Sequence, residues 1–515
     1  MLKAWKRTFA ALLIPGLWLL PAQAAIERLL KDNWIGVSGQ HFKVFSNAEA
    51  DTVRAVTEDL ERFQFFLPVI APELQINRYA PPLLVYLLKD RQSYYEINRC
   101  DICTGFFIQA PAGNYIAVSL EGYRSDPDHI NNARRYLYHE YVHYAIRNAT
   151  DRRHYPLWYE EGLAELFSTF LYSDKVIRVG LMREDMWLID FDEPFPLESV
   201  LKRRDVPKNN REAARYYNYA LILYRYFMSG PENRATLENY ISLLNQGLSV
   251  DQAFQRTFAT SYEQFALKLR TYLNLVRRAY NQPKFLYLYF KLTDRFQPPA
   301  VTSTPLTAAG RAFRLGDLLM KKYPDQLARS ALLFTRALDL DRRYVPAYLG
   351  LSRYNLRQKR PYHALFYLNR AFEVVQIDET PEMLAIQGNI FLNLAVESFN
   401  QGENNWTSWA ERARKSYRRA LRQSPHFVPA GLGLAYYYIL YDRAGRRYNR
   451  SEALKSLQRV HDTMDFATID YYLARFLLRQ GNKSRAQELL QNILIWNPDS
   501  PIAGDARILL RHPRG

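Results

Sequence analysis

The sequence predicts an α+β domain that is followed by an all-α solenoid. Three apolar or alternating runs are typical of strands, namely His41 to Ser46, Pro82 to Leu88 and Asn114 to Leu120. Thr52 to Leu67 has the apolar period of a helix. Beyond residue 306 this mixture gives way to a repeat with a 34-residue period. We therefore expect a mixed sheet with helices first and stacked helix pairs after it.

The length of the chain, 515 residues, is enough for two or three domains that each bury their own core. We divide it into a signal peptide over residues 1–24, a first domain over 25–295 and a repeat domain over 306–515. Pro298 and Pro299, followed by Thr302 to Pro305, interrupt the pattern between the two domains.

The first twenty-four residues have the features of a secretory signal peptide. Its charged start, apolar middle and small-residue cleavage site are Lys3, Lys6 and Arg7, then Ala10 to Leu20, then Ala22, Gln23 and Ala24. The apolar run is shorter than the roughly 20 residues of a membrane span, and no later stretch qualifies. We expect an exported chain without a transmembrane segment, periplasmic if the source is a Gram-negative bacterium.

The formal net charge is +17, and removal of the three basic signal residues leaves +14. Such a charge favours acidic partners, which in a cell envelope are anionic lipid headgroups, acidic polysaccharide or peptidoglycan stem peptides. The basic residues are spread in small groups, so a solvated basic surface without a dedicated partner is an equal alternative. No basic tail or nucleic-acid motif is present, and we expect no nucleic-acid partner.

The only two cysteines, Cys100 and Cys103, form a Cys-Asp-Ile-Cys string. In an oxidising compartment this pair predicts a local disulfide. A thioredoxin-like redox couple would need a strand-to-helix setting, and a Cys₄ zinc site would need two more cysteines.

The chemistry of the chain is concentrated in residues 139–165. On a helix expected over Asn131 to Asn148, His139 and His143 stand one turn apart on one face, so both imidazoles can bind a single Zn²⁺ with Glu140 beside it. A catalytic zinc ion takes three protein ligands and one water. Glu161 is placed to supply the third ligand, and its neighbour Glu160 is the rival.

The string from Trp158 to Ala164, Trp-Tyr-Glu-Glu-Gly-Leu-Ala, resembles the Trp-x-x-Glu-Gly-x-Ala element of the gluzincin metallopeptidases. That group contains thermolysin and the zinc aminopeptidases, and the likeness is strongest to its bacterial peptidase-MA-like branch. Glu161 lies 18 residues after His143, which agrees with the group's spacing. The resemblance implies a mixed sheet over the His-bearing helix and a helical subdomain after it. It also implies one Zn²⁺ per chain on His139, His143 and Glu161, with Glu140 as general base.

The same resemblance implies supporting residues. Glu165 lies one turn beyond Glu161, where it can hold a ligand imidazole. Related enzymes stabilise the oxyanion with a Tyr further along the chain, and the register of the stretch around residue 216 leaves Tyr216, Tyr217 and Arg215 open for that role.

Gluzincins also pair an extended peptide substrate with an edge strand of the sheet. Tyr115 to Leu120 would be that strand here, with an interior strand as the alternative. We expect the remainder of the domain, to about residue 290, to be helical.

The repeat domain resembles a tetratricopeptide array of about five repeats. Ala337 recurs as Ala371 after 34 residues and as Ala420 after an insertion of about fifteen more. Pro346 follows Ala337 by nine residues, as Pro429 follows Ala420. The family implies protein binding but not a particular partner.

Together these features favour an exported zinc-dependent peptidase whose repeat domain recruits a substrate or partner protein. The alternative is an envelope interaction scaffold whose repeat array is the working part and whose zinc site is structural or vestigial. Cleavage of cell-wall peptide cross-links is a third interpretation. Every peptide presents the same carbonyl to the metal, so the motif does not choose a substrate.

Overall fold

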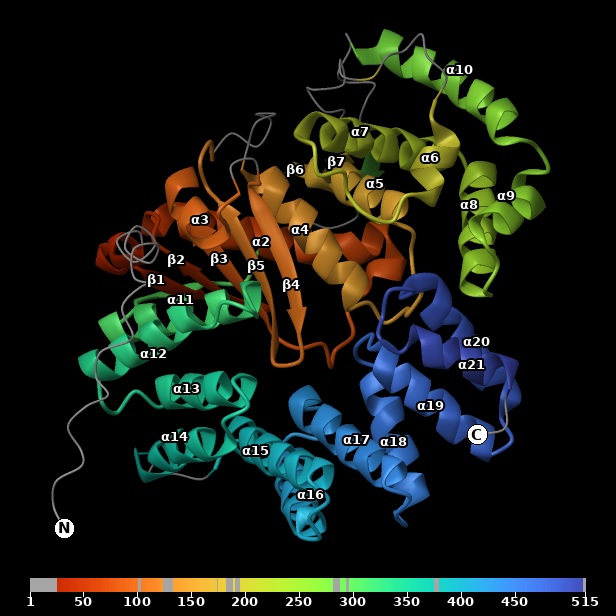
Figure 1. The fold of residues 1–515 in the computed structure, drawn as a ribbon. Helices are drawn as coiled ribbons and strands as arrows, with labels where there is room; N and C mark the ends of the chain where they lie inside the picture. The colour runs from red at the N-terminus through yellow and green to blue at the C-terminus, as the bar shows by residue number, and fades with distance from the viewer. Residues whose placement is uncertain are drawn as a thin grey trace, which may run out of the picture.

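A computed structural model describes residues 26–100, 103–123, 133–173, 175–181, 189, 195–280, 288–292, 296–374 and 379–512. The predicted signal peptide, residues 1–24, lies outside this set. A mixed region of strands and helices comes first, and an array of helix pairs curves beneath it (Figure 1). Within the described ranges, no helix combines the length and apolar character needed to cross a membrane.

The first domain is built on a six-stranded mixed sheet with the strand order β4-β5-β3-β2-β1-β9. Its strands are β1 (Ile35–Ser38), β2 (Phe42–Ser46), β3 (Leu83–Leu88), β4 (Gly105–Ala110), β5 (Gly113–Ser119) and β9 (Thr302–Pro305). The parallel strands β2, β3 and β5 form the centre, while β4 and β1 pair antiparallel on either side. Helices α2 (Ala50–Ile70) and α3 (Arg91–Asn98) connect the central strands, and a 3₁₀ turn, η2 (Pro72–Leu74), follows α2.

The strand expected at the edge of the sheet is an interior strand. β5, which contains most of the segment Tyr115 to Leu120, lies between β3 and β4, and every residue of it is buried. An unbroken apolar run from Tyr115 to Val118 suits a strand covered on both faces. The edge strand on this side is β4.

Helices cover both faces of the sheet, and one of them belongs to the repeats. On one face, Val85, Leu87, Ile116 and Val118 pack with α2 and with α4 (Arg134–Arg147). On the other face, Tyr86, Tyr115 and Ala117 pack with Leu315 and Leu318 of α11 (Ala308–Lys322). The Tyr115 hydroxyl also donates a hydrogen bond to Asp317 Oδ2 at 2.8 Å. The first repeat helix is therefore a layer of the first domain.

The helical subdomain after α4 contains α5 (Leu157–Ser168), α6 (Leu197–Lys202), α7 (Asn210–Phe227), α8 (Pro231–Asn245), α9 (Val250–Phe258) and α10 (Tyr262–Tyr280). The expectation that this region is wholly helical is wrong. A small antiparallel sheet, β6 (Leu171–Ser173), β7 (Val176–Val179) and β8 (Leu288–Lys291), joins its two ends. Alternate residues of β7 are buried, which is the period of a strand.

The segment expected to separate the domains also contributes to the first one. Thr302–Pro305 forms β9, which pairs antiparallel with β1 and extends the sheet beyond the boundary expected at residue 295. Threonines favour strands, and a proline is tolerated because β9 is the outermost strand.

The described helices from α11 onward form five antiparallel pairs and a final helix, which we call the repeat array. After α11 these are α12 (Ala328–Leu340), α13 (Val345–Arg357), α14 (Pro361–Val374), α15 (Pro381–Asn400), α16 (Trp406–Gln423), α17 (Val428–Arg443), α18 (Arg450–His461), α19 (Ala467–Arg479), α20 (Lys483–Trp496) and α21 (Ala503–Arg511). The recurring Ala337, Ala371 and Ala420 are fully buried in the second helices of their pairs. Pro346 and Pro429 lie in the first turns of α13 and α17, where a missing N–H costs nothing.

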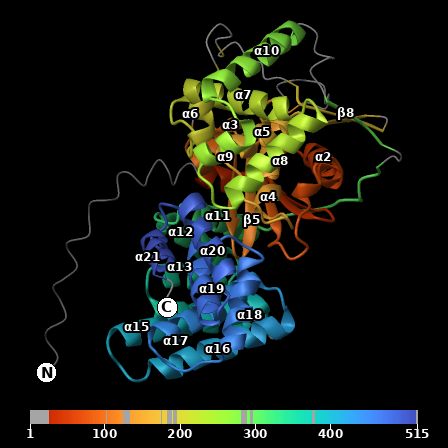
Figure 2. The same ribbon diagram turned by 90° about the vertical axis from the view of Figure 1, so that its right-hand side faces the viewer.

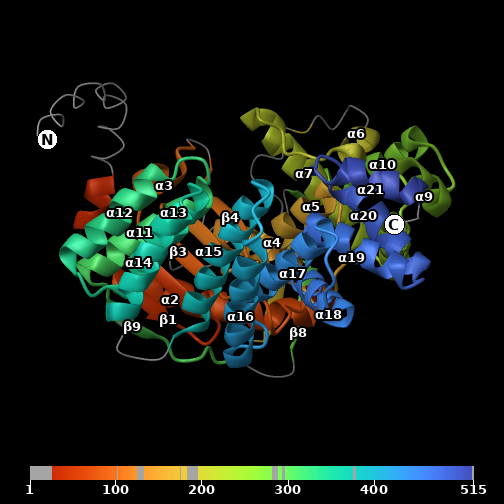
Figure 3. The ribbon, with the colours of Figure 1, turned by 60° about the horizontal axis from the view of Figure 1, so that its bottom comes forward.

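The array arches from the sheet to the far side of the first domain (Figures 1 and 3). Its far end returns at α20, where Trp496 stacks on His154 with ring centroids 5.3 Å apart. Between the ends, His426 stacks on Tyr79 at 3.5 Å. The view turned by 90° has the middle of the array below the first domain (Figure 2).

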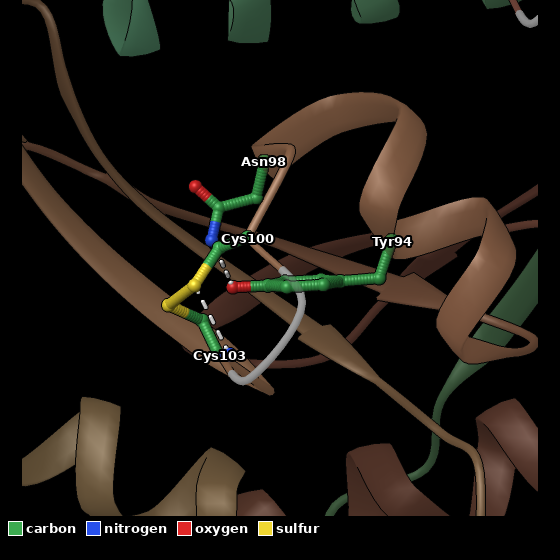
Figure 4. Close-up of a disulfide and its surroundings, with 4 residues drawn as sticks. All are labelled: Tyr94, Asn98, Cys100 and Cys103. Carbon is green, nitrogen blue, oxygen red and sulfur yellow. Dashed lines mark hydrogen bonds between the residues drawn. A yellow bond between two sulfur atoms is a disulfide. The ribbon is translucent and has the colours of Figure 1, made fainter. Parts of the chain in front are cut away.

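The Cys100–Cys103 disulfide predicted from the sequence is present in the loop between α3 and β4 (Figure 4). The Cys103 N–H donates a hydrogen bond to Cys100 Sγ at 3.1 Å, and the Asn98 amide donates one to the Tyr94 hydroxyl at 2.7 Å. The loop leads directly into Gly105, the first residue of the edge strand.

Because α11 covers one face of the sheet, we expect Leu318→Ala to destabilise both halves of the protein together. Leu318 is fully buried in that interface, and truncation of such a leucine lowers the free energy of unfolding by about 2–5 kcal/mol. Urea denaturation followed by circular dichroism measures this loss. The matched control is Leu332→Ala on α12, whose side chain is 53% exposed and should change stability by less than about 0.5 kcal/mol. Equal effects of the two substitutions would contradict the shared interface.

Candidate metal centre

Two imidazoles lie side by side on the face of α4 opposite its apolar side. The helix buries its apolar side, including Leu137, Tyr141 and Val142, against the sheet and α2. This leaves His139 and His143, one turn apart, partly buried and facing away from that core, with side-chain exposures of 14% and 17%. Their Nε2 atoms lie 3.1 Å apart.

A carboxylate from α5 completes a triangle with these imidazoles. Glu161 Oε2 lies 3.3 Å from His139 Nε2 and 3.5 Å from His143 Nε2. Across the part of the chain that the structure describes, these three residues are the one group of His, Cys, Asp or Glu close enough to share a metal ion. The sequence-predicted ligand set is therefore brought together in space.

The triangle has the dimensions that a tetrahedral zinc ion requires. With Zn–N and Zn–O bonds of about 2.0–2.1 Å, the ligand atoms of a tetrahedron lie about 3.3–3.4 Å apart. The three distances, 3.1, 3.3 and 3.5 Å, bracket that value. In addition, Glu161 Oε2 is buried without a hydrogen bond of normal geometry and faces the two imidazoles, so its charge is balanced either by their protons or by a bound cation. The residues present fit a zinc ion.

The two other glutamates of α5 have different neighbours. Glu165 Oε1 lies 3.4 Å from His139 Nδ1, so it is placed to fix the tautomer and orientation of that ring. Glu160, the rival for the third ligand, turns instead toward α4, where its Oε2 forms an ion pair with Arg147 Nη2 at 2.9 Å. Of the adjacent pair Glu160 and Glu161, only Glu161 faces the imidazoles.

Glu140 lies between α4 and the start of the edge strand. A Cβ atom built on Gly105 would come within 2.9 Å of Glu140 Cγ, so only glycine leaves room for this carboxylate. Burial raises the pKa of Glu140, although the nearby His139 and His143 partly offset the effect. A carboxylate that holds a proton more readily is suited to proton transfer.

The charges within the triangle are strongly coupled. For His139, burial lowers the pKa, but Glu161 and Glu165 outweigh it and hold the pKa well above its usual range. For His143 the same competition, led by burial and then Glu161, leaves its pKa raised. For Glu161, burial opposes ionisation, yet the two imidazoles lower its pKa to about 2. The carboxylate is ionised at neutral pH, and a metal ion must displace a proton from the imidazoles to bind.

The candidates for oxyanion stabilisation all lie on α7. Tyr216 is buried, its hydroxyl has no hydrogen-bond partner, and burial together with the charge of Glu161 raises its pKa. Tyr217 is partly buried and sets its ring edge-on against His139, with centroids 6.0 Å apart. Arg215 Nη2 donates to the Tyr219 hydroxyl at 3.4 Å. Both tyrosines therefore border the ligand set.

Gly162 explains how α7 reaches the ligands. A Cβ atom at this position would lie 2.4 Å from the Ala220 carbonyl oxygen and 2.8 Å from Tyr224 Cβ. The glycine after Glu161 thus lets α5 and α7 pack backbone to backbone, which brings Tyr216 and Tyr217 to the site.

Sequence reasoning did not find two residues that border the site. Gly105 makes room for Glu140, and the start of a strand carried no signal for that role. Lys322, at the end of α11, lies over the Phe106 ring of β4 with its Nζ 4.1 Å from the centroid. Burial lowers its pKa while the charge of Glu140 opposes this, so it lies near Glu140 although 182 positions separate them in the chain.

Comparisons with known proteins find a weak likeness to solved structures and no match in sequence. No protein-family profile matches the chain, and no curated protein matches it. Two solved structures are similar, a thermophilic TPR protein of Thermus thermophilus and YrrB, described as a TPR protein with an unusual peptide-binding site. They share 20% and 18% identity, cover 39% of this chain each and 97% and 92% of their own, and have TM-scores of 0.30 and 0.27. Likeness at this level carries no argument about function.

We expect Gly162→Ala to separate α5 from α7 and to lower the free energy of unfolding by about 1–3 kcal/mol, because the new methyl group meets backbone rather than a flexible side chain. Thermal unfolding measures the change. Gly504→Ala in α21 is the matched control: nothing lies within 4 Å of its Cβ position, so alanine should add up to about 1 kcal/mol through helix propensity. A stabilising Gly162→Ala would contradict the close packing of α5 on α7.

Proposed function

We propose that this protein is an exported zinc-dependent peptidase. The observation that carries the proposal is the triangle of His139 Nε2, His143 Nε2 and Glu161 Oε2, with separations of 3.1, 3.3 and 3.5 Å. Three protein ligands from two helices leave a fourth tetrahedral position for a water molecule, which is the arrangement of catalytic rather than structural zinc sites.

His139, His143 and Glu161 would hold the ion, and Glu165 would orient His139. When bound, zinc supplies a Lewis acid that polarises a carbonyl group and lowers the pKa of water to about 7. Glu140 takes the proton of the attacking water and returns it to the leaving amine. Tyr216, with its unpartnered hydroxyl, is the better placed donor to the developing oxyanion, and Tyr217 is the alternative.

The substrate would be an extended peptide on the free edge of β4. The Ser119 N–H donates to the Thr104 carbonyl, so the hydrogen-bonded pairs of β4 with β5 fall at Phe106, Ile108 and Ala110. Consequently Gly105, Phe107 and Gln109 direct their backbone groups away from β5. A peptide can pair with these groups as an added strand that starts beside Glu140.

Export is supported by two features. The first twenty-four residues have the pattern of a signal peptide, and the cysteines are paired in a disulfide, which persists in oxidising compartments. We place the protein in the periplasm if the organism is Gram-negative. The net charge of +14 after signal removal suits acidic envelope components as neighbours.

The second candidate function is an interaction scaffold of the envelope. The observation that favours it is a groove of about 760 Å³ on the inner side of the repeat array, lined by α11, α13, α15 and α17. A scaffold would work through this groove with a zinc site that is structural or vestigial.

The zinc content of variants distinguishes Glu161 from its neighbour Glu160 as the third ligand. Purified wild-type protein should contain about one zinc per chain, measured by mass spectrometry after gel filtration. Glu161→Gln and His143→Ala should lose the metal because each removes a ligand atom of the triangle. Glu160→Gln is the matched control and should keep it, because Glu160 faces Arg147. Loss of zinc with Glu160→Gln and retention with Glu161→Gln would reverse the assignment.

The activity should depend on Glu140. With unfolded casein as substrate, Glu140→Gln should lower kcat by about 10²–10⁴ through loss of the general base, while zinc content stays the same. The exposed Glu232→Gln on α8 serves as control and should leave the rate unchanged. A scaffold would show no cleavage with either variant, and its partner binding would survive Glu140→Gln.

A further inference from the structure

The groove on the inner side of the array reaches the sheet at the tip of the β4–β5 hairpin. Its volume is about 760 Å³, and its lining combines two parts of the chain. The sheet contributes Leu84, Tyr115 and the β4–β5 hairpin tip at Pro111 and Ala112. The array contributes the first helices of four successive pairs, α11, α13, α15 and α17. Figure 1 shows α13, α15 and α17 below the lower ends of the strands, and α11 alongside the sheet.

The free edge of β4 leads from the metal centre to this groove. Gly105 at one end of the strand touches Glu140, and Ala110 at the other end precedes Pro111 in the groove wall. Five residues separate the two ends of the strand, or roughly 17 Å at about 3.4 Å per residue. A peptide paired with β4 therefore reaches the groove about five residues from the residue opposite Glu140.

The charged groups in the groove do not balance. Its two carboxylates, Asp317 and Glu382, both pair with Arg353, and Asp317 also accepts the Tyr115 hydroxyl. Lys321 follows Asp317 by one turn of α11, and no carboxylate of the described residues lies within 4.0 Å of its Nζ. The Lys321 Nζ lies over the face of the Tyr115 ring, 5.8 Å from its centroid. The groove therefore holds five cationic side chains, Lys43, Arg314, Lys321, Arg353 and Arg443, against two carboxylates, and the carboxylates lie closer to Arg353 than to Lys321.

The remaining lining is apolar and partly open to solvent. Val396 on α15 and Tyr436 on α17 are both 38% exposed in the groove. Ile386, Leu392 and Leu432 extend this surface. A second lysine, Lys322, lies over Phe106 of β4. Positive charge therefore flanks the path at both the strand and the groove.

We propose that the groove binds an acidic and apolar segment of the same extended peptide that pairs with β4, with Lys321 selecting an Asp or Glu side chain about five residues from the bond presented to His139, His143 and Glu161. The inference rests on the proposed peptidase function and adds a substrate class to it. The array and the sheet together form the groove, so the length of β4 between the groove and the metal ligands would set how far the acidic residue lies from the cleaved bond.

The electrostatics of Lys321 agree with this geometry. Burial lowers its pKa to about 8, and Arg353 and Arg357 add to the effect, while Asp317 and Glu382 oppose it. An incoming carboxylate would stabilise the charged form, so acidic-peptide binding should weaken as the pH rises through about 8.

The experiment measures binding separately from cleavage. The probe is a fluorescein-labelled, amide-capped peptide of alternating leucine and glutamate, compared with its twin that carries glutamine at each glutamate. Both are titrated by fluorescence anisotropy against the full-length Glu140→Gln protein. We expect the glutamate peptide to bind about tenfold tighter, which is the size of one charge-assisted contact. Addition of Lys321→Gln should remove this preference and leave the affinity for the glutamine peptide unchanged.

Two matched variants keep the result interpretable. Lys415→Gln removes an exposed lysine on α16 and should preserve the preference for the glutamate peptide. Lys321→Arg retains the charge and should also preserve it, which tests whether substitution at this position misfolds the protein. An unchanged preference with Lys321→Gln, or equal affinity for the two peptides before that change, would overturn the inference. Tighter binding of a glutamine peptide with a free C-terminus would also overturn it in favour of chain-end recognition. Failure of the peptidase proposal is read separately, from casein cleavage by the wild-type protein.

Discussion

A buried carboxylate oxygen between two imidazoles is the constraint around which the first domain is arranged. Glu161 Oε2 has no hydrogen bond of normal geometry and lies 3.3 and 3.5 Å from the Nε2 atoms of His139 and His143. Such an oxygen is tolerated inside a protein when a protonated imidazole or a bound cation shares its site. The arrangement requires α5 to approach α4 on one side and α7 on the other, and Gly162 makes the second approach possible. The position of both candidate tyrosines follows from that contact.

The repeat array, which we propose as a binding surface, is also a structural part of the first domain. α11 covers one face of the sheet, and Tyr115 and Asp317 join the two by a hydrogen bond. At the other end of the array, Trp496 stacks on His154. Between these ends His426 stacks on Tyr79, so the array contacts the first domain at both ends and in the middle, which fixes the groove relative to the edge strand β4. In the proposed function, a peptide bound in the groove would therefore lie at a set distance along β4 from the metal centre.

The sequence was sufficient for features that depend on short-range spacing. The separation of His139 from His143, and of both from Glu161, predicted that three ligand atoms would converge, and the structure brings them together. The local Cys100–Cys103 disulfide and the 34-residue repeat are of the same kind. Features that depend on distant pairing were not predictable. The interior position of β5, the pairing of β7 with β8 and of β1 with β9, and the placement of Lys321 over Tyr115 and of Lys322 over Phe106 all require residues far apart in the chain to meet. Periodicity within a segment carries no information about such partners.

The central claim is that two imidazoles and one carboxylate hold a zinc ion, and zinc K-edge X-ray absorption of the purified wild-type protein tests it most directly. We expect a four-coordinate ion with only nitrogen and oxygen ligands at about 2.0 Å, and with the multiple-scattering signal of two imidazoles. A shell of sulfur at about 2.3 Å would assign the metal to Cys100 and Cys103 instead. Six-coordinate zinc without imidazole scattering, or a protein that retains no zinc, would contradict zinc binding by His139, His143 and Glu161.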